Sequence, residues 1–395
     1  MNATTPPTVA TRATPGPAAI HTRPYQICTR CVMDTSDPRI DFDADGVCHH
    51  CHSFDESRAS RLLEGAEGAR VWQESIAAMK AAGRGREYDC VVGISGGVDS
   101  TYVNYLVAKA GLRPLAVHLD NGWNSELATH NIEGALTRLG VDLHTHVIDW
   151  EEFRALQLAF LRASTPDSEL PTDHAIFGLL LRTANKHRIP YIVTGMNFAT
   201  ESTNVPDWTY SPADWRYIRG IHRRHGSGTL KTYPHFGLAY LLYTFGIRRV
   251  KLVSPLNYIP YDRQKAMEVL KTELGWRDYG GKHHESIYTR FFQSYILPRK
   301  FNIDKRRAHY SDRIKSGLMT RTDALEALEA PPCDPQLMNE DRQYALKKLR
   351  LKEAEFESIM SLPRRTFREF PNNDSLIRGL KSLQHWLRKH RAIHK

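Results

Sequence analysis

The fold of this chain is decided by one stretch, Cys90-Val-Val-Gly-Ile-Ser-Gly-Gly-Val-Asp-Ser100. Its first five residues form a short continuous apolar run, which is typical of a strand buried inside a parallel sheet. The two adjacent glycines lack a Cβ atom, so the backbone there can adopt positive φ and approach an anion closely. A helical pattern follows from Val98. Strand, glycine turn and helix in this order predict a phosphate-binding loop at a helix N-terminus.

The loop itself, Ser95-Gly96-Gly97-Val98-Asp99-Ser100, supplies groups suited to pyrophosphate. Its successive backbone N–H groups form a concave anion site, to which the helix adds its unpaired N–H groups and its dipole. The two serines can donate hydroxyl hydrogen bonds, and Asp99 can hold Mg²⁺. Neither G-x-x-x-x-G-K-[ST] nor a G-x-G-x-x-G after a strand occurs, which excludes the Walker and dinucleotide-binding loops. The alternative is an ordinary strand-to-helix turn with a serine cap.

Strand and helix patterns alternate on the C-terminal side of the loop. Three further strands are predicted, at 115–119, 143–148 and 191–194. Helices are predicted at 98–110, 125–139, 151–162 and 173–187. Strands joined through helices imply right-handed crossovers and a parallel sheet covered on both faces. The predicted fold class is therefore α/β, with a parallel, doubly wound sheet.

The flanking sequence divides the chain into four parts. We predict a disordered tail over 1–24, a four-cysteine metal-binding knuckle over 25–54, a nucleotide-binding domain over 55–235 and a helical region over 236–395. Residues 55–80 read as one helix, 201–234 read as irregular, and no strand pattern follows 236. The aromatic and arginine side chains of 208–231 suit a sugar ring, a nucleobase or an anionic group.

Composition limits the class of protein without choosing a substrate. The 395 residues carry 54 Lys and Arg against 44 Asp and Glu, a formal charge of +10, which favours acidic partners. No apolar run is long enough for a transmembrane helix, and the first residues lack the apolar core of a secretory signal. The few cysteines indicate a reducing compartment, so we expect a cytoplasmic protein.

Four of the six cysteines lie close together, as Cys28-x₂-Cys31 and Cys48-x₂-Cys51. This spacing is typical of a four-thiolate zinc site, because each pair directs two sulfurs toward one ion. Four protein ligands leave no open position for chemistry, so the site is expected to be structural. An iron–sulfur cluster is the alternative, since four thiolates hold such clusters too.

The Ser-Gly-Gly-x-Asp-Ser loop after a first strand resembles that of the PP-loop, or N-type, ATP pyrophosphatases. The resemblance implies an adenine-nucleotide α-hydrolase-like sheet and an ATP- and Mg²⁺-dependent reaction. Members cleave ATP between the α- and β-phosphates, adenylate a carbonyl oxygen, and let a nitrogen or sulfur nucleophile displace AMP.

Between Tyr25 and Ala330 the chain further resembles the N-acetyl sugar amidotransferases of bacterial surface-polysaccharide assembly. The segments that carry this resemblance are Cys28-Thr-Arg-Cys-Val-Met-Asp-Thr-Ser36, Leu119-Asp-Asn-Gly-Trp-Asn-Ser125, Thr165-Pro-Asp167, Pro171-Thr-Asp-His-Ala-Ile176, Tyr288-Thr-Arg-Phe-Phe-Gln293 and Phe301-Asn-Ile-Asp-Lys-Arg306. It implies conversion of an acetamido group on a free or nucleotide-linked sugar into an acetamidino group, in lipopolysaccharide or O-antigen synthesis. It also implies a separate glutaminase partner, like the glutaminase and cyclase subunits of imidazole glycerol phosphate synthase.

Further site residues are expected at the carboxyl ends of the strands, where open α/β sheets bind ligands. We place the nucleobase between Leu119 and Met196, with Gly195 and Asp120 beside it. Core packing is the alternative for Met196, and capping of the Asn-Gly turn is the alternative for Asp120. The resemblance adds Lys300 and Lys305 as cations for the leaving pyrophosphate, so the expected catalytic residues are Ser95, Asp99, Ser100, Lys300 and Lys305.

The sequence shows no source of ammonia. A glutaminase needs a nucleophilic cysteine; four are assigned to the metal, Cys90 lies in a predicted buried strand, and Cys333 follows two prolines. This favours a separate ammonia-supplying subunit. The rival function is a PP-loop enzyme that thiolates or amidates tRNA, for which the basic charge and the zinc knuckle would also be suitable.

Overall fold

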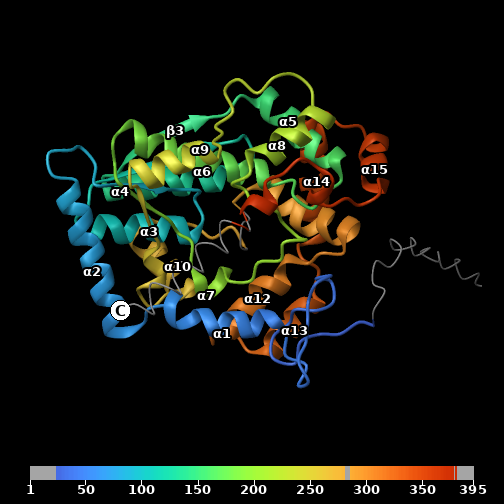
Figure 1. The fold of residues 1–395 in the computed structure, drawn as a ribbon, viewed down its shortest axis with the longest axis horizontal. Coiled ribbons are helices and arrows are strands. Elements are labelled where there is room, and N and C mark those ends of the chain that lie inside the picture. The colour runs from blue at the N-terminus through green and yellow to red at the C-terminus, as the bar shows by residue number, and fades with distance from the viewer. Residues whose placement is uncertain (1–23, 281–284, 378, 380–395) are drawn as a thin grey trace, which may run out of the picture.

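The computed structural model describes residues 24–280, 285–377 and 379. Its centre is a five-stranded sheet with the order β3-β2-β1-β4-β5 (Figure 1). The strands are β1 (Cys90–Gly93), β2 (Pro114–Asp120), β3 (Asp142–Val147), β4 (Tyr191–Val193) and β5 (Lys251–Val253). All four strand pairings are parallel. The predicted parallel α/β fold is therefore confirmed.

Helices cover both faces of the sheet. The helices of this part are α2 (Gly65–Ala82), α3 (Val98–Lys109), α4 (Glu126–Leu139), α5 (Trp150–Ala163), α6 (Leu170–Lys186), α7 (Phe198–Glu201), α8 (Trp215–His225) and α10 (Arg263–Leu274). Side chains along β1 alternate between two cores: Val91 packs in the core that contains α5 and α6, whereas Cys90 and Val92 pack in the core that contains α3 and α10. This alternation explains why the strand reads as apolar throughout.

The strand order reverses at β1, which has β2 on one side and β4 on the other. A crevice at the carboxyl end of the sheet forms at such a position, because the chain leaves β1 in one direction and β4 in the other. The loop Ser95–Ser100 follows β1 directly. The topology therefore places the predicted phosphate loop at the switch point.

Three predictions about secondary structure were wrong. The strand β5 lies beyond 236, where no strand was expected; it has only three residues and two of them are exposed, so it carries no apolar run. Residues 55–80 form parts of two helices, because the chain is extended at Leu62 and Glu64 after α1 (His49–Arg61). The supposedly irregular stretch 201–234 contains α8, which the Asp214 side chain caps.

The C-terminal part is helical, as predicted. Its elements are α9 (Leu238–Leu241), η1 (Leu242–Ile247), η2 (Pro255–Asn257), α11 (Ile287–Phe291), η3 (Phe292–Phe301), α12 (Lys305–Lys315), α13 (Arg321–Glu329), α14 (Pro335–Leu349), α15 (Glu353–Ser361) and η4 (Phe367–Glu369). Figure 1 shows α1, which begins inside the cysteine knuckle, beside α12 and α13. The first segment of the chain thus packs against a late one.

The predicted tail over 1–24 lies almost wholly outside the described residues, as does the C-terminal end of the predicted helical region, beyond 379. Within the described part, no helix has the length and apolar character needed to cross a membrane.

Candidate functional site

The loop after β1 depends on glycine at two close approaches. Gly96 has φ +82°, and a Cβ atom there would lie 2.7 Å from the carbonyl oxygen of Ala128. A Cβ atom on Gly195, just after β4, would lie 3.1 Å from the carbonyl carbon of Asp99. A side chain at Gly96 would therefore clash, one at Gly195 would be tight, and the chain just after β4 packs directly on the start of α3.

The two loop serines hold the turn in shape. The Ser95 N–H donates to Ser100 Oγ over 3.1 Å, and the two hydroxyl oxygens are 3.1 Å apart. The Gly97 N–H donates to Ser95 Oγ over 3.3 Å, and Trp276 Nε1 donates to the Gly96 carbonyl over 2.9 Å. The loop is thus held in shape by its own serines and by Trp276.

Asp99 lies in the first turn of α3 and lines a cavity next to the loop. Its carboxylate accepts a hydrogen bond from the hydroxyl of Tyr261. Burial and this carboxylate raise the pKa of Tyr261, so the phenol stays protonated and keeps donating. A carboxylate fixed beside a phosphate loop is a suitable oxygen ligand for Mg²⁺.

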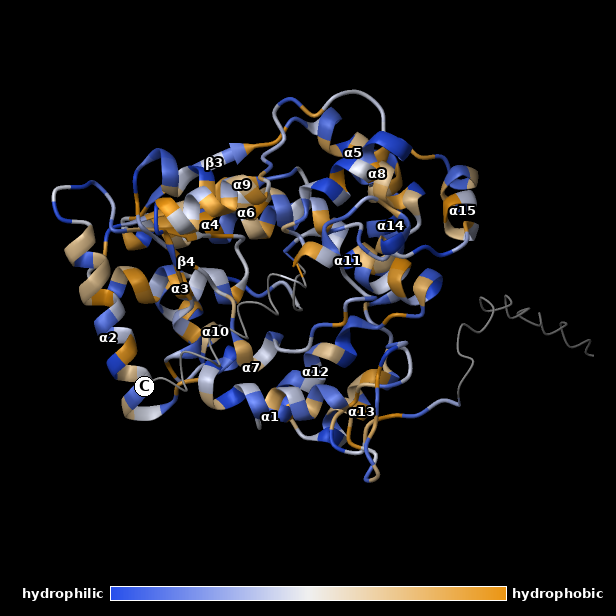
Figure 2. Ribbon diagram, in the orientation of Figure 1, coloured by the Kyte–Doolittle hydropathy of each residue, from blue (hydrophilic) through white to orange (hydrophobic). Residues whose placement is uncertain are grey.

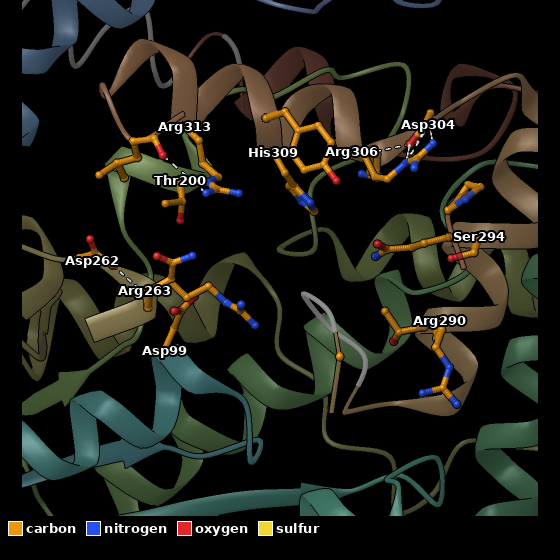
Figure 3. Close-up of a pocket in the computed structure, with 18 of the residues that line it drawn as sticks. Asp99, Thr200, Asp262, Arg263, Arg290, Ser294, Asp304, Arg306, His309 and Arg313 are labelled. Atoms are coloured by element: carbon orange, nitrogen blue, oxygen red, sulfur yellow. Dashed lines mark hydrogen bonds and ion pairs between the residues drawn. The ribbon is translucent and has the colours of Figure 1, made fainter. Parts of the chain in front are cut away.

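The cavity has a volume of about 370 Å³ and lies between the loop and the C-terminal helices (Figure 3). Its lining residues from the sheet side are Asp99, Thr200, Tyr261, Asp262, Arg263 and Gln264. Those from the C-terminal side include Thr289, Arg290, Gln293, Ser294, Asp304, Lys305, Arg306, His309, Tyr310 and Arg313. Figure 3 shows Asp99 and Arg263 across the cavity from Arg290 and Ser294.

The C-terminal wall is rich in positive charge, and two of its arginines are held firmly. Arg290 makes two hydrogen bonds to Asp341, of 2.6 and 2.7 Å, and Arg306 pairs with Asp304 at 2.7 Å. Lys305, at the start of α12, is half-buried, and burial lowers its pKa. Such a wall suits an anionic ligand.

Lys300 does not belong to this wall, which corrects the prediction for that residue. Its side chain is 5% exposed, and Nζ donates to the carbonyl oxygens of Ile359, Met360 and Leu362 over 2.5, 3.1 and 3.0 Å. It therefore supplies hydrogen bonds to carbonyl groups in the last turn of α15 and at its C-cap, where the helix leaves carbonyls without helical partners. Of the two predicted lysines, only Lys305 reaches the cavity.

The residues predicted for the nucleobase lie at the carboxyl ends of β2 and β4. Leu119 is buried, whereas Met196 is 66% exposed, so Met196 is not a core residue. Asp120 accepts the Gly122 N–H over 2.8 Å, which is the turn-capping role weighed as its alternative. Their contacts with a nucleobase remain a prediction.

The aromatic segment is mainly core, which corrects the idea that it forms a ligand surface. Trp208, Tyr210 and Tyr217 are each at most 5% exposed. Tyr217 donates to Asp167 over 2.7 Å, and Trp208 donates to the carbonyl of Ser36 over 3.3 Å. The polar ends of these rings are used inside the protein.

The four knuckle cysteines are fully buried and meet at one point. The sulfur atoms of Cys28 and Cys51 are 3.9 Å apart, those of Cys31 and Cys48 are 3.6 Å apart, and those of Cys48 and Cys51 are 3.8 Å apart. A tetrahedral zinc ion with Zn–S bonds of about 2.3 Å has sulfur–sulfur edges of about 3.8 Å. The four thiols therefore fit a single tetrahedral ion.

The knuckle is hydrogen-bonded to α13 and to α12, which carries part of the cavity wall. The Arg321 guanidinium, from α13, donates to the carbonyls of Cys28 and Cys31 over 2.9 and 3.0 Å. The N–H of Val32 donates to Ser311 Oγ, in α12, over 3.2 Å. Since α12 also carries Lys305, the knuckle helps to position that side of the cavity.

Several cavity and loop residues were not predicted. Among them are Tyr261, Arg263, Tyr279, Glu285 and His309. They lie far from the loop along the chain and share no motif or periodicity with it. Only the folded chain brings them to the loop.

Comparison with known proteins identifies the C-terminal part. Residues 285–384 match the family described as LPS biosynthesis protein WbpG-like, C-terminal domain. No curated protein matches the chain.

Two solved structures are similar in part. One is a predicted subunit of tRNA methyltransferase from Methanocaldococcus jannaschii, with 14% identity, a TM-score of 0.26, and coverage of 46% of this chain and 74% of that one. The other is NMN synthetase from Francisella tularensis, with 15% identity, a TM-score of 0.27, and coverage of 58% of this chain and 93% of that one.

Proposed function

We propose that this chain, whose residues 285–384 belong to the WbpG-like C-terminal domain family of LPS biosynthesis, is an ATP-dependent sugar amidotransferase. It would convert an acetamido group of a sugar, free or nucleotide-linked, into an acetamidino group. One observation carries the proposal: Asp99, at the end of the loop, lines a cavity whose opposite wall comes from that domain. This supports a site in which the nucleotide and the sugar bind next to each other.

ATP binding is assigned to the loop and to the start of α3. The backbone N–H groups and the hydroxyls of Ser95 and Ser100 suit the β- and γ-phosphates. Asp99 would hold Mg²⁺, which would offset part of the negative charge of the phosphates. Leu119, Asp120, Gly195 and Met196 lie at the ends of β2 and β4, where the adenosine part would bind.

The reaction that fits this site has two bond exchanges. The acetamido oxygen forms a bond to the α-phosphorus of ATP, the bond between that phosphorus and the β-phosphate oxygen breaks, and the amide proton is released. Ammonia then adds to the activated carbon, and AMP departs with the former amide oxygen, leaving the amidine. The loop stabilises the departing pyrophosphate, and Lys305 adds positive charge on the other side.

We further propose that ammonia comes from a separate glutaminase subunit. A glutaminase in this chain would need a reactive thiol. Cys90 is fully buried, and burial raises its pKa, so its reactive thiolate form is disfavoured. Burial also raises the pKa of Cys333, and the other four thiols meet in the knuckle.

Pyrophosphate release tests the proposed reaction. The purified chain is given ATP, Mg²⁺ and ammonium chloride with a panel of acidic N-acetyl sugars, their nucleotide-linked forms, or bulk tRNA. We expect release with one sugar and, by mass spectrometry, a product in which NH replaces oxygen. Release with tRNA alone would instead place the chain among RNA-modifying enzymes.

The source of ammonia is tested with glutamine in place of ammonium chloride. We expect no product from the pure chain with glutamine. Amidine formed with glutamine alone would contradict the separate subunit, while leaving the ATP-dependent step intact.

A further inference from the structure

Two side chains from outside the loop already lie on its phosphate-facing groups. The Val98 N–H, at the start of α3, donates to the hydroxyl oxygen of Tyr279 over 3.1 Å. Ser95 Oγ donates to the carboxylate of Glu285 over 3.4 Å. A Cβ atom on Gly97 would come within 3.0 Å of Glu285 Oε1 and 3.2 Å of Tyr279 Oη. Two oxygen atoms therefore cover the concave side of the loop.

The backbone around Glu285 is fixed to the sheet. The carbonyl of Glu285 accepts the Ser125 N–H over 2.9 Å, and the Ile287 N–H donates to the carbonyl of Trp123 over 2.9 Å. These bonds tie the segment to the chain just after β2, at the carboxyl end of the sheet. The Glu285 side chain is thereby directed at the loop.

The chemistry of the two covering groups imitates a bound anion. A carboxylate oxygen and a neutral hydroxyl oxygen accept from the same kinds of donor that bind phosphate. Burial, with the Glu285 carboxylate nearby, raises the pKa of Tyr279, so its phenol remains neutral. Of the two covering groups, Glu285 is therefore the one that brings negative charge to the loop.

We propose that Glu285 and Tyr279 form an internal anion mimic that occupies the phosphate loop until ATP displaces it. The inference rests on the proposed function, because it takes ATP as the displacing ligand. A triphosphate and the Glu285 carboxylate cannot share the same donors, since two negative charges at contact distance repel each other. ATP binding therefore requires the Glu285 side chain to leave the loop.

The covering carboxylate lies close in the sequence to the C-terminal wall of the cavity. Glu285 precedes Ser286, the N-cap of α11, and the α11 residues Thr289 and Arg290 line that wall. One short segment therefore supplies a group to the loop and two residues to the opposite wall.

The test is calorimetric titration with α,β-methylene-ATP, which resists cleavage at the reactive position, with and without Mg²⁺. Glu285→Gln keeps the shape and loses the charge, so we expect ~5- to 10-fold tighter binding than wild type, most clearly without Mg²⁺. Tyr279→Phe removes the hydroxyl and should tighten binding by about two- to threefold. Glu268→Gln, on the exposed side of α10, is the matched control and should leave the Kd unchanged.

Equal or weaker binding by Glu285→Gln overturns the proposal, and loss of the Mg²⁺ effect would identify Glu285 as an ion ligand instead. If thermal unfolding shows that Glu285→Gln does not fold, Tyr279→Phe provides the test instead: equal or weaker binding by that variant overturns the proposal. If wild type binds the nucleotide but the variants bind it no more tightly, only this inference is overturned. No binding by any of the chains would overturn the proposed function together with it.

Discussion

Lys300 and Lys305 lie close together in the sequence but in different surroundings. Lys300 Nζ binds three carbonyl groups at the end of α15, whereas Lys305 lines the cavity. The same residue type therefore serves stability at one position and ligand binding at the other. The direction of each side chain, and not its charge, decides the role.

This difference gives a paired prediction. Lys300→Met leaves buried carbonyl oxygens without donors, so we expect the free energy of unfolding to fall by roughly 1–3 kcal/mol. Binding of α,β-methylene-ATP should not change. Lys305→Met should instead keep its stability and lose roughly 10- to 100-fold in the rate of pyrophosphate release.

Chemical denaturation and the pyrophosphate assay check the two halves of this prediction. A folded, stable Lys300→Met protein with greatly weakened nucleotide binding would restore Lys300 to the site. A Lys305→Met protein with full activity would remove Lys305 from it.

At the scale of elements, the loop and its neighbouring strands act as one rigid unit. The positive φ of Gly96 and its contact with the Ala128 carbonyl connect the loop to α4. The close approach of Gly195 connects it to β4. A substitution at either glycine would therefore disturb the loop together with the neighbouring element, α4 or β4.

A glycine pair tests this rigidity. We expect Gly96→Ala to lower the free energy of unfolding by roughly 1–3 kcal/mol, because alanine is strained at positive φ and its methyl group would overlap a carbonyl oxygen. Nucleotide binding should weaken as well. Gly134→Ala is the control, because Gly134 lies on the exposed side of α4 with no atom near its Cβ position. This substitution should raise the free energy of unfolding by about 0.5–1 kcal/mol. Unchanged stability and binding in Gly96→Ala would contradict the tight loop.

The elements also show where sequence reasoning succeeds. The loop was predictable because strand, glycines and helix are contiguous, so a local pattern contains the whole motif. β5 was not predictable: it has three residues, of which Lys251 and Leu252 are exposed, and it is a strand only because it pairs with β4. Tyr261 and Glu285 were missed for a related reason, since tertiary contacts alone bring them to the loop.

For the molecule as a whole, the knuckle links the start of the described chain to α12 and α13, two helices of its C-terminal part. The cysteine spacing predicted a four-ligand site, and the buried sulfurs agree with it. The spacing could not predict what the site is for, because the partners of the knuckle are the Ser311 hydroxyl in α12 and the Arg321 guanidinium in α13. Figure 2 shows α12 as mainly hydrophilic, so its sequence has no apolar pattern that would predict its contact with the knuckle.

Loss of the metal from the knuckle should therefore affect α12, α13 and the activity at the cavity. We expect one tightly bound zinc ion per chain by elemental analysis, and its loss in Cys28→Ser. Hydrogen exchange in α12 and α13 should then become faster, and pyrophosphate release should fall, because α12 carries Lys305. Cys333→Ser, outside the knuckle, is the control and should keep the metal. Loss of the ion with unchanged exchange in α12 would show that the knuckle does not position that helix.

The hydrogen bond between Val32 and Ser311 joins positions 279 residues apart. On a ribosome that adds ~5–20 residues per second, the knuckle emerges roughly 15 to 60 s before α12 is made. During that interval the knuckle lacks the groups of α12 and α13 to which it is hydrogen-bonded in the folded chain. The order of synthesis therefore favours metal capture by the nascent knuckle first, so the availability of the ion during translation would set how much of the chain reaches its final form.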